Sequence, residues 1–162
     1  MTGIYHNDMP LSEHFRLGEF LKSRTAEQHQ PKPIPNIPLK RHITAMQNLA
    51  VRCLEPTRRH FGLPIQINSG YRCEMVNRLV GGVGNSQHLL GEAADITIPR
   101  KYWPFGLTTS EQVARLLFRW MRDELPTFDQ LILEHAGSSW WVHVSCRIEW
   151  RKNRKQVMMI VA

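Results

Sequence analysis

Two histidines and one aspartate occupy positions from which they could bind one metal ion. His88 precedes Asp95 by seven residues, and small residues between them allow the loop to fold back closely. His143 lies in a later alternating segment, between Val142 and Val144. If these valines face the core, His143 stands on the same polar sheet face as Asp95. Two His and one carboxylate are ligands typical of a catalytic zinc site with a fourth position for water. The alternative is a polar sheet face without metal.

A predicted hairpin brings an acidic side chain towards His143. The Gly-Ser pair at 137–138 suits a two-residue type II′ turn, and this register pairs Glu134 with Trp141. Glu134 and His143 are then diagonal neighbours with Cα atoms about 7–8 Å apart. A carboxylate there can take a proton from zinc-bound water. Two alternatives stay open: Glu134 is a solubilising edge charge, or a one-residue slip turns it away and places His135 beside His143.

Arg72 and two tryptophans are candidates for substrate contact. Arg72 follows a predicted strand and should lie at the rim of the same sheet, where its guanidinium can bind a carboxylate or a developing oxyanion. Trp140 and Trp141 can form the wall of a cleft. The alternatives are a surface ion pair for Arg72 and ordinary strand packing for the tryptophans.

Hydrophobic periodicity predicts the elements that position these residues. Asp95 should point away from the core in its strand, and Thr108 with Glu111 forms a possible capping box for a later helix. The segment 99–109, between a predicted strand and a predicted helix, is either a lid over the substrate cleft or a packed connection between these elements. The order of mixed elements predicts an α+β fold, with helices flanking a small mixed or antiparallel sheet. Helices are expected at 41–60, 73–80 and from 108 onward, and strands at 65–68, 94–98, 128–134, 140–146 and 156–161.

Composition limits the class of protein. The chain has 162 residues and a net charge of +7, which favours one main domain attracted to anionic polymers. No apolar run is long enough to span a membrane, and the first residues lack the features of a secretory signal. Three cysteines without a CxxC pair fit a reducing compartment. Four prolines between 28 and 40 predict an extended connector, and we place the main boundary there.

Three segments together resemble the zinc D-Ala-D-Ala carboxypeptidase family, whose metallopeptidases share a fold with the Hedgehog signalling domain. The segments are SGYR at 69–72 with VNRLVGG at 76–82, SQHLLGEAADI at 86–96, and DQLILE at 129–134 with WVHVS at 141–145. The central one fits the family's SxHxxGxAxD pattern at every defined position. Together the matches span about 69–145.

The resemblance implies roles for individual residues. His88, Asp95 and His143 would bind one zinc ion, Glu134 would be the general base, and Arg72 would orient the substrate and polarise its carbonyl. Some family members place the acidic residue three positions before the last His, where this chain has a tryptophan. The hairpin register is the reason for assigning the base to Glu134.

The same motifs suggest a substrate surface and a reaction. We expect Arg72, Tyr71, Ser86 and Trp141 to contact substrate. Family members cleave bacterial cell-wall peptides, as carboxypeptidases that remove terminal D-Ala or as endopeptidases, including bacteriophage endolysins. The resemblance therefore implies a zinc metallopeptidase that hydrolyses peptidoglycan stem peptides. Its zinc peptidase-like domain, of the Hedgehog/DD-peptidase-like α+β type, would occupy 41–162 behind an appendage and connector at 1–40.

This interpretation leads to expectations about partners and cellular location, and two other hypotheses about function compete with it. We expect a peptidoglycan peptide as partner, no nucleic acid and no membrane insertion, and the sequence is compatible with a monomer. Cytoplasmic synthesis is expected, with either release to the wall as a phage or prophage lysin or recycling of muropeptides. One rival is a non-catalytic Hedgehog-like cell-wall-binding module that contains zinc, in which Glu134 would point away from the metal. The other is a nucleic-acid-binding domain that uses the basic cluster at 147–155.

Overall fold

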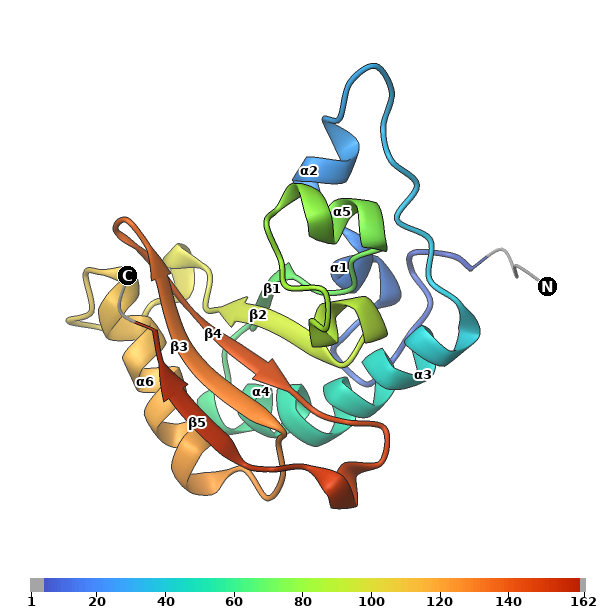
Figure 1. The fold of residues 1–162 in the computed structure, drawn as a ribbon. Coiled ribbons are helices and arrows are strands. Elements are labelled where there is room, and N and C mark those ends of the chain that lie inside the picture. The colour runs from blue at the N-terminus through green and yellow to red at the C-terminus, as the bar shows by residue number, and fades with distance from the viewer. Residues whose placement is uncertain (1–4, 161–162) are drawn as a thin grey trace.

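The α+β fold predicted from the sequence is confirmed by a computed structural model, which describes residues 5–160 (Figure 1). Five strands form one mixed sheet in the order β1-β2-β4-β3-β5. All neighbours are antiparallel except β3 and β5, which are parallel. The strands are β1 Gln66–Ser69, β2 Ala93–Thr97, β3 Gln130–Ala136, β4 Ser139–Ser145 and β5 Gln156–Met159.

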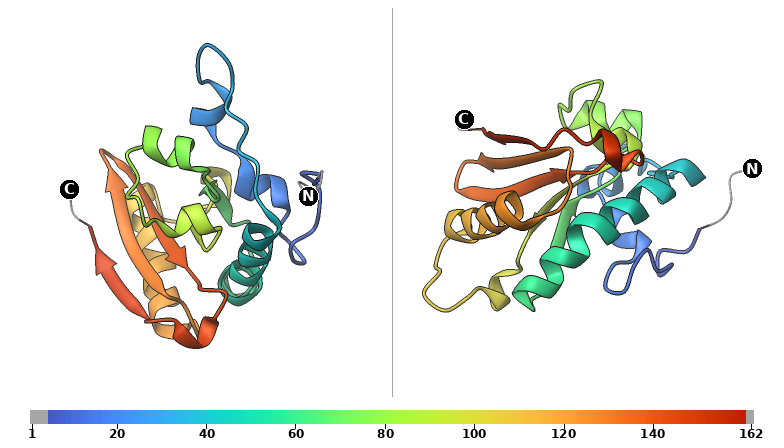
Figure 2. Two further views of the ribbon diagram at one scale, coloured as in Figure 1. Left: turned by 45° about the vertical axis from the view of Figure 1, so that its right-hand side comes forward. Right: turned by 90° about the horizontal axis from the view of Figure 1, so that it is seen from below.

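Helices cover both faces of this sheet (Figures 1 and 2). The long α6 and the continuous helix formed by α3, η1 and α4 lie on one face, and the short α5 and η2 lie on the other. None of the helices in the described part of the chain is both long and apolar enough to cross a membrane. The α-helices are α1 Leu17–Leu21, α2 Arg24–Glu27, α3 Lys40–Leu49, α4 Glu55–Phe61, α5 Glu74–Leu79 and α6 Ser110–Glu124. The π-helix is η1 Ala50–Leu54, and the 3-10 helices are η2 Gln87–Leu90, η3 Arg100–Tyr102 and η4 Trp150–Lys152.

The hydrophobic core lies between the sheet and its two long helices. Val142 and Val144 of β4 are fully buried there, as their alternation with His143 predicts. Ile96 of β2 and Leu117 of α6 belong to the same cluster. Burial of each such side chain contributes about 1.5–3 kcal/mol. This packing fixes one face of β2 and β4, so the polar residues that alternate with the core residues must point to the other face.

The predicted helix over 41–60 is present but contains an irregular turn. The α3 helix passes through the π-helical η1 before it continues as α4 to Phe61. Pro56 lies just after this wide turn, and its ring nitrogen has no hydrogen to donate to the preceding turn. A single proline therefore explains why the regular hydrogen-bond pattern is interrupted here.

The capping prediction for α6 was wrong by one residue. The box is formed by Thr109, whose hydroxyl accepts the amide hydrogen of Gln112, while the Gln112 side chain accepts the amide hydrogen of Thr109. Thr108 and Glu111 fit the same motif, in which a Thr is followed three residues later by Glu or Gln, so the motif alone cannot choose between the registers.

The N-terminal residues contribute to the same hydrophobic cluster as the rest of the chain. Leu11, Phe15 and Phe20 are buried in it. The proline-containing stretch 28–39 forms neither helix nor strand, as predicted. The division of the chain at residue 40 stays a prediction.

Glu55 of α4 anchors this N-terminal segment. Its side chain is 3% exposed, and Oε1 accepts hydrogen bonds from the Ser12 hydroxyl and the His14 amide, both at 2.7 Å. Oε2 lies 2.8 Å from His14 Nδ1. Burial by itself would raise the pKa of the Glu55 carboxyl, but these contacts outweigh it and lower the pKa.

Replacement of Glu55 by Gln should therefore destabilise the fold in a pH-dependent way. A carboxyl whose pKa is lowered in the folded state adds stability above its usual pKa of 4.5 and loses it as the pH falls. We expect Glu55→Gln to reduce the free energy of unfolding by about 1–2 kcal/mol at pH 7, with a smaller difference at pH 3.5. Urea unfolding at both pH values measures this, with Glu124→Gln, at an exposed position, as control. An equal loss at both pH values would contradict the account.

Candidate functional site

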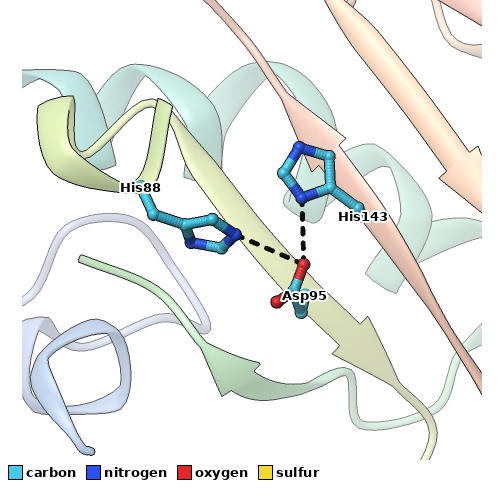
Figure 3. Close-up of side chains that lie close together, drawn as sticks. All are labelled: His88, Asp95 and His143. Atoms are coloured by element: carbon cyan, nitrogen blue, oxygen red, sulfur yellow. Dashed lines mark hydrogen bonds and ion pairs between the residues drawn. The ribbon is translucent and has the colours of Figure 1, made fainter. Parts of the chain in front are cut away.

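Three side chains from different elements converge on the polar face of the sheet, as Figure 3 shows. His88 comes from η2, Asp95 from β2 and His143 from β4. Asp95 and His143 are directly opposite each other in the antiparallel pair. Asp95 Oδ1 lies 3.0 Å from His143 Nδ1 and 3.4 Å from His88 Nε2. The cross-strand register and one short helix therefore bring together residues 55 positions apart in the chain.

Two glycines allow the close backbone approach that places His88. Its Nδ1 lies 2.7 Å from the carbonyl oxygen of Gly70, so Nδ1 carries the hydrogen and Nε2 keeps its lone pair for a metal. A Cβ on Gly70 would lie 2.6 Å from the Phe20 carbonyl oxygen. Gly91 ends η2 with a φ of 73°, and a Cβ there would meet the His42 carbonyl oxygen at 2.6 Å. Both positions therefore require glycine.

The geometry of the three side chains fits a tetrahedral metal ion. One ligand atom from each of His88, Asp95 and His143 lies within 4.8 Å of the other two. A zinc ion with bonds of about 2.0–2.1 Å holds its tetrahedral ligand atoms roughly 3.3 Å apart. The observed separations of 3.0 and 3.4 Å about Asp95 Oδ1 match this. The set of donors, two imidazoles and one carboxylate, is also of the kind that zinc prefers.

Asp95 is buried as well as being turned away from the core. The alternation in β2 predicted only its direction, and burial arises because η2 packs over this face of the strand. Burial alone would raise the pKa of Asp95, but the adjacent His88 and the hydrogen bond from His143 outweigh it and hold the pKa well below its usual range. The carboxyl is therefore held in its anionic form, which is the form that binds a metal.

Arg72 contacts the second oxygen of the same carboxylate. Its Nη2 lies 3.2 Å from Asp95 Oδ2, and its Nε donates to the Ser69 hydroxyl at 2.9 Å. Ser69 is the cross-strand neighbour of Asp95, across a bulge in β1. The Arg72 side chain is 15% exposed and lines the cleft described next. The structure thus places Arg72 beside the candidate metal ligands, with contacts that also orient Asp95.

A cleft of about 620 Å³ opens over the three ligands, and Glu134 lines it. The predicted hairpin register is confirmed, because Glu134 pairs with Trp141 across β3 and β4. Gly137 has a φ of 58°, as the first central residue of a type II′ turn requires. The slip that would have placed His135 beside His143 does not occur.

Glu134 has an environment suited to proton transfer. Burial and then the nearby Asp95 carboxylate raise the pKa of the Glu134 carboxyl, while His143 and a hydrogen bond from Trp141 act in the opposite direction. That hydrogen bond runs from the indole Nε1 to Oε2 over 2.8 Å. A carboxylate with a raised pKa is a stronger base near neutral pH.

The remaining predicted contact residues differ in their placement. Ser86 lines the cleft, and its hydroxyl accepts the amide hydrogen of His88 at the start of η2. Trp141 is only partly buried and holds Glu134. The Tyr71 ring is buried and stacks on His42, so it faces a separate pocket rather than the main cleft.

The segment 99–109 is a connection and not part of the cleft. The indole of Trp103 donates to the carbonyl oxygen of Ile98 at 2.8 Å, whereas Phe105 is fully exposed. No residue of this segment lines the cavity over the metal ligands. The cavity instead extends over Gln130 and Ile132 of β3 and over Arg147 and Arg154 of the basic cluster at 147–155. None of these four residues was predicted to line the cleft.

A second group of side chains has the composition of a metal site but a different role. Glu13, His14 and Glu55 each offer a ligand atom within 4.8 Å of the others. The oxygens of Glu55 are already occupied by Ser12 and His14. This group is explained by the anchoring of the N-terminal segment.

Comparison with known proteins agrees with the site geometry. The model of the peptidase M15 family matches residues 13–145, which include all three candidate metal ligands as well as Arg72 and Glu134. No curated protein was found to match the chain. The resemblance predicted from the sequence motifs is confirmed by this match. The chain belongs to the peptidase M15 family of zinc-dependent metallopeptidases.

Proposed function

We propose that this chain hydrolyses peptide bonds in peptidoglycan stem peptides with one zinc ion held by His88, Asp95 and His143. The observation that carries the proposal is their convergence on the floor of a cleft that Glu134 and Arg72 also line. Membership of a metallopeptidase family supports the reaction class. The volume of the cleft, about 620 Å³, lies within the usual range of ligand-binding sites, which supports a bound substrate there.

Glu134 is proposed as the general base. Zinc, when bound, supplies a Lewis acid that polarises a peptide carbonyl and lowers the pKa of water. Glu134 then accepts a proton from the attacking water and returns it to the leaving amine, a role that its raised pKa suits. The indole of Trp141 fixes one carboxylate oxygen, so the other is free to face the water. Trp141 is therefore a positioning residue in this mechanism.

Arg72 is proposed to have two functions. Its contacts with Ser69 and Asp95 fix the guanidinium in place before substrate arrives. Nη1 also donates to Asn77 Oδ1 at 3.5 Å, which leaves one N–H on each terminal nitrogen. These two N–H groups are available to a substrate carboxylate or to the oxygen that becomes negative during attack. A preorganised donor of this kind stabilises the transition state without reorganisation.

The non-catalytic binding module is the second candidate, and the orientation of Glu134 disfavours it. In that alternative Glu134 would point away from the metal ligands. Glu134 instead lines the cleft over them, and its pKa responds to Asp95 and His143. A base placed in this way has no function in a site that only binds.

The first prediction concerns hydrolysis. Purified peptidoglycan and defined muropeptides incubated with the zinc-loaded protein should yield new fragments by mass spectrometry, and the masses identify the bond that is cleaved. Glu134→Gln should slow this reaction by about 100-fold or more, because the proton acceptor is lost. The variant should retain zinc as the wild type does. Absence of fragments from a zinc-loaded wild type would refute the proposal for these substrates.

The second prediction concerns metal binding. The wild type should retain about one zinc ion per chain after dialysis, and zinc should raise its melting temperature. His143→Ala should weaken zinc binding by more than about 100-fold, because loss of even an outer partner costs 10–100-fold. His29→Ala, in the proline-containing stretch, serves as the control. Equal zinc affinity of both variants, measured by calorimetry, would show that the ion binds elsewhere.

The third prediction concerns Trp141. Trp141→Phe keeps an aromatic ring but removes the donor that lowers the pKa of Glu134. The pKa of Glu134 should therefore rise, and the acidic limb of the kcat/KM profile should move to higher pH. Trp140→Phe is the matched control, because its ring stacks on His135 and not on Glu134. A profile that is unchanged in Trp141→Phe would show that the hydrogen bond does not tune the base.

A further inference from the structure

The cleft continues along the sheet beyond the metal ligands. Gln130, Ile132 and Glu134 alternate on one face of β3, and all three line the cavity. Ile132 pairs with His143, so Glu134 lies on one side of the metal position and Gln130 on the other. A peptide bound along this face would therefore run past the catalytic residues towards the end of the cleft formed by Gln130.

Two arginines line that end of the cleft, and a buried carboxylate orients both. Asp129 has no exposed surface. Its Oδ1 accepts from Arg147 Nε at 2.9 Å and from Arg154 Nε at 3.0 Å, and its Oδ2 accepts from Arg154 Nη2 at 2.7 Å. The Arg154 amide also donates to Oδ1, at 3.1 Å. The guanidinium groups are thus fixed by a group that a ligand cannot reach.

Both arginines keep donors for a ligand. Neither terminal nitrogen of Arg147, nor Nη1 of Arg154, has a hydrogen-bond partner among residues 5–160. Their side chains are 37% and 49% exposed while they line the cavity. Glu92 is the acidic residue on this part of the lining. Its oxygens accept from the Ile148 amide at 3.2 Å and from Gln87 Nε2 at 3.1 Å, so they are engaged elsewhere.

We propose that Arg147 and Arg154 form a subsite for a free carboxylate of the bound peptide. The inference rests on the proposed function and names the substrate class: a peptide with an acidic group at a distance from the cleaved bond. Arg147 lies four residues beyond His143, which is at most about 13 Å along extended chain. Such a reach corresponds to a carboxylate up to about four residues from the scissile bond.

Two planar guanidinium groups suit this ligand. Each presents paired N–H groups in the geometry that a carboxylate accepts. Asp129 preorganises them, so little side-chain freedom is lost when the ligand binds. A neutral amide at the same place would accept fewer of these bonds. It would also leave one positive charge unbalanced, because the two arginines share the single Asp129 carboxylate.

The test compares two peptides that differ in one group. Stem pentapeptides ending in D-Ala-D-Ala are prepared with the glutamyl α-carboxyl either free or converted to its carboxamide. Binding to zinc-loaded Glu134→Gln is measured by calorimetry, and kcat/KM is measured with the wild type. We expect the free acid to bind about 10-fold more tightly and to be cleaved with a correspondingly higher kcat/KM.

Variants of the basic cluster provide the matched control. Arg147→Gln removes one arginine while Asp129 keeps its bidentate partner Arg154, so the fold should be retained. This variant should lose most of the preference for the free acid over the amide. Arg151→Gln alters a residue that stacks on Trp150 and does not line the cleft, and it should keep the full preference.

The outcomes separate this inference from the proposed function. Equal binding and cleavage of the two peptides by the wild type would overturn the subsite and leave the peptidase proposal intact. A preference that Arg151→Gln abolishes as fully as Arg147→Gln would also overturn it, because general charge attraction would then explain the effect. If neither peptide is cleaved, the peptidase proposal fails for these substrates, and calorimetry still decides whether the acid is preferred.

Discussion

The candidate site depends on a single buried carboxylate. Asp95 faces His143 and His88 with one oxygen, at 3.0 and 3.4 Å, and Arg72 with the other, at 3.2 Å. A buried anion is unfavourable unless polar or positive partners surround it, so all three neighbours must be placed accurately. In the proposed function, Oδ1 faces the metal ion while Arg72 fixes Oδ2. The proposal therefore links metal binding and substrate orientation through one side chain.

The short segment at the end of β1 supplies most of this positioning. Ser69 stands opposite Asp95 and accepts from Arg72, while the carbonyl oxygen of Gly70 fixes the ring of His88. The Gly70 backbone can do this because it lies against Phe20 of α1, with no room for a side chain. The helix α1 thus helps to place the His88 ring, although it contributes none of the candidate metal ligands. The segment SGYR at 69–72 therefore positions His88 and Asp95 through its backbone and its serine as much as through its arginine.

Much of the site could be predicted from the sequence because its determinants are local. Alternation along β4 placed His143 on the face of the sheet away from the two buried valines. The Gly-Ser turn set the register that brings Glu134 to the same face as His143. Other features depend on tertiary packing and carry no local signal: the indole bond to Glu134, the burial of Asp95, and the extension of the cleft to the basic residues after β4. The cap of α6 was misplaced because two adjacent motifs fit equally well. The π turn before Pro56 was missed because periodicity does not resolve one extra residue per turn.

The central claim is that the three converging side chains hold one zinc ion and leave room for water and substrate. A crystal structure of the zinc-loaded protein, with anomalous diffraction measured at the zinc absorption edge, tests it most directly. The account predicts one strong anomalous peak, with His88 Nε2, Asp95 Oδ1 and His143 Nδ1 as the only protein ligands, at about 2.0–2.2 Å. A fourth protein ligand would contradict a catalytic site, and a peak at the Glu55 cluster instead would contradict the assignment altogether.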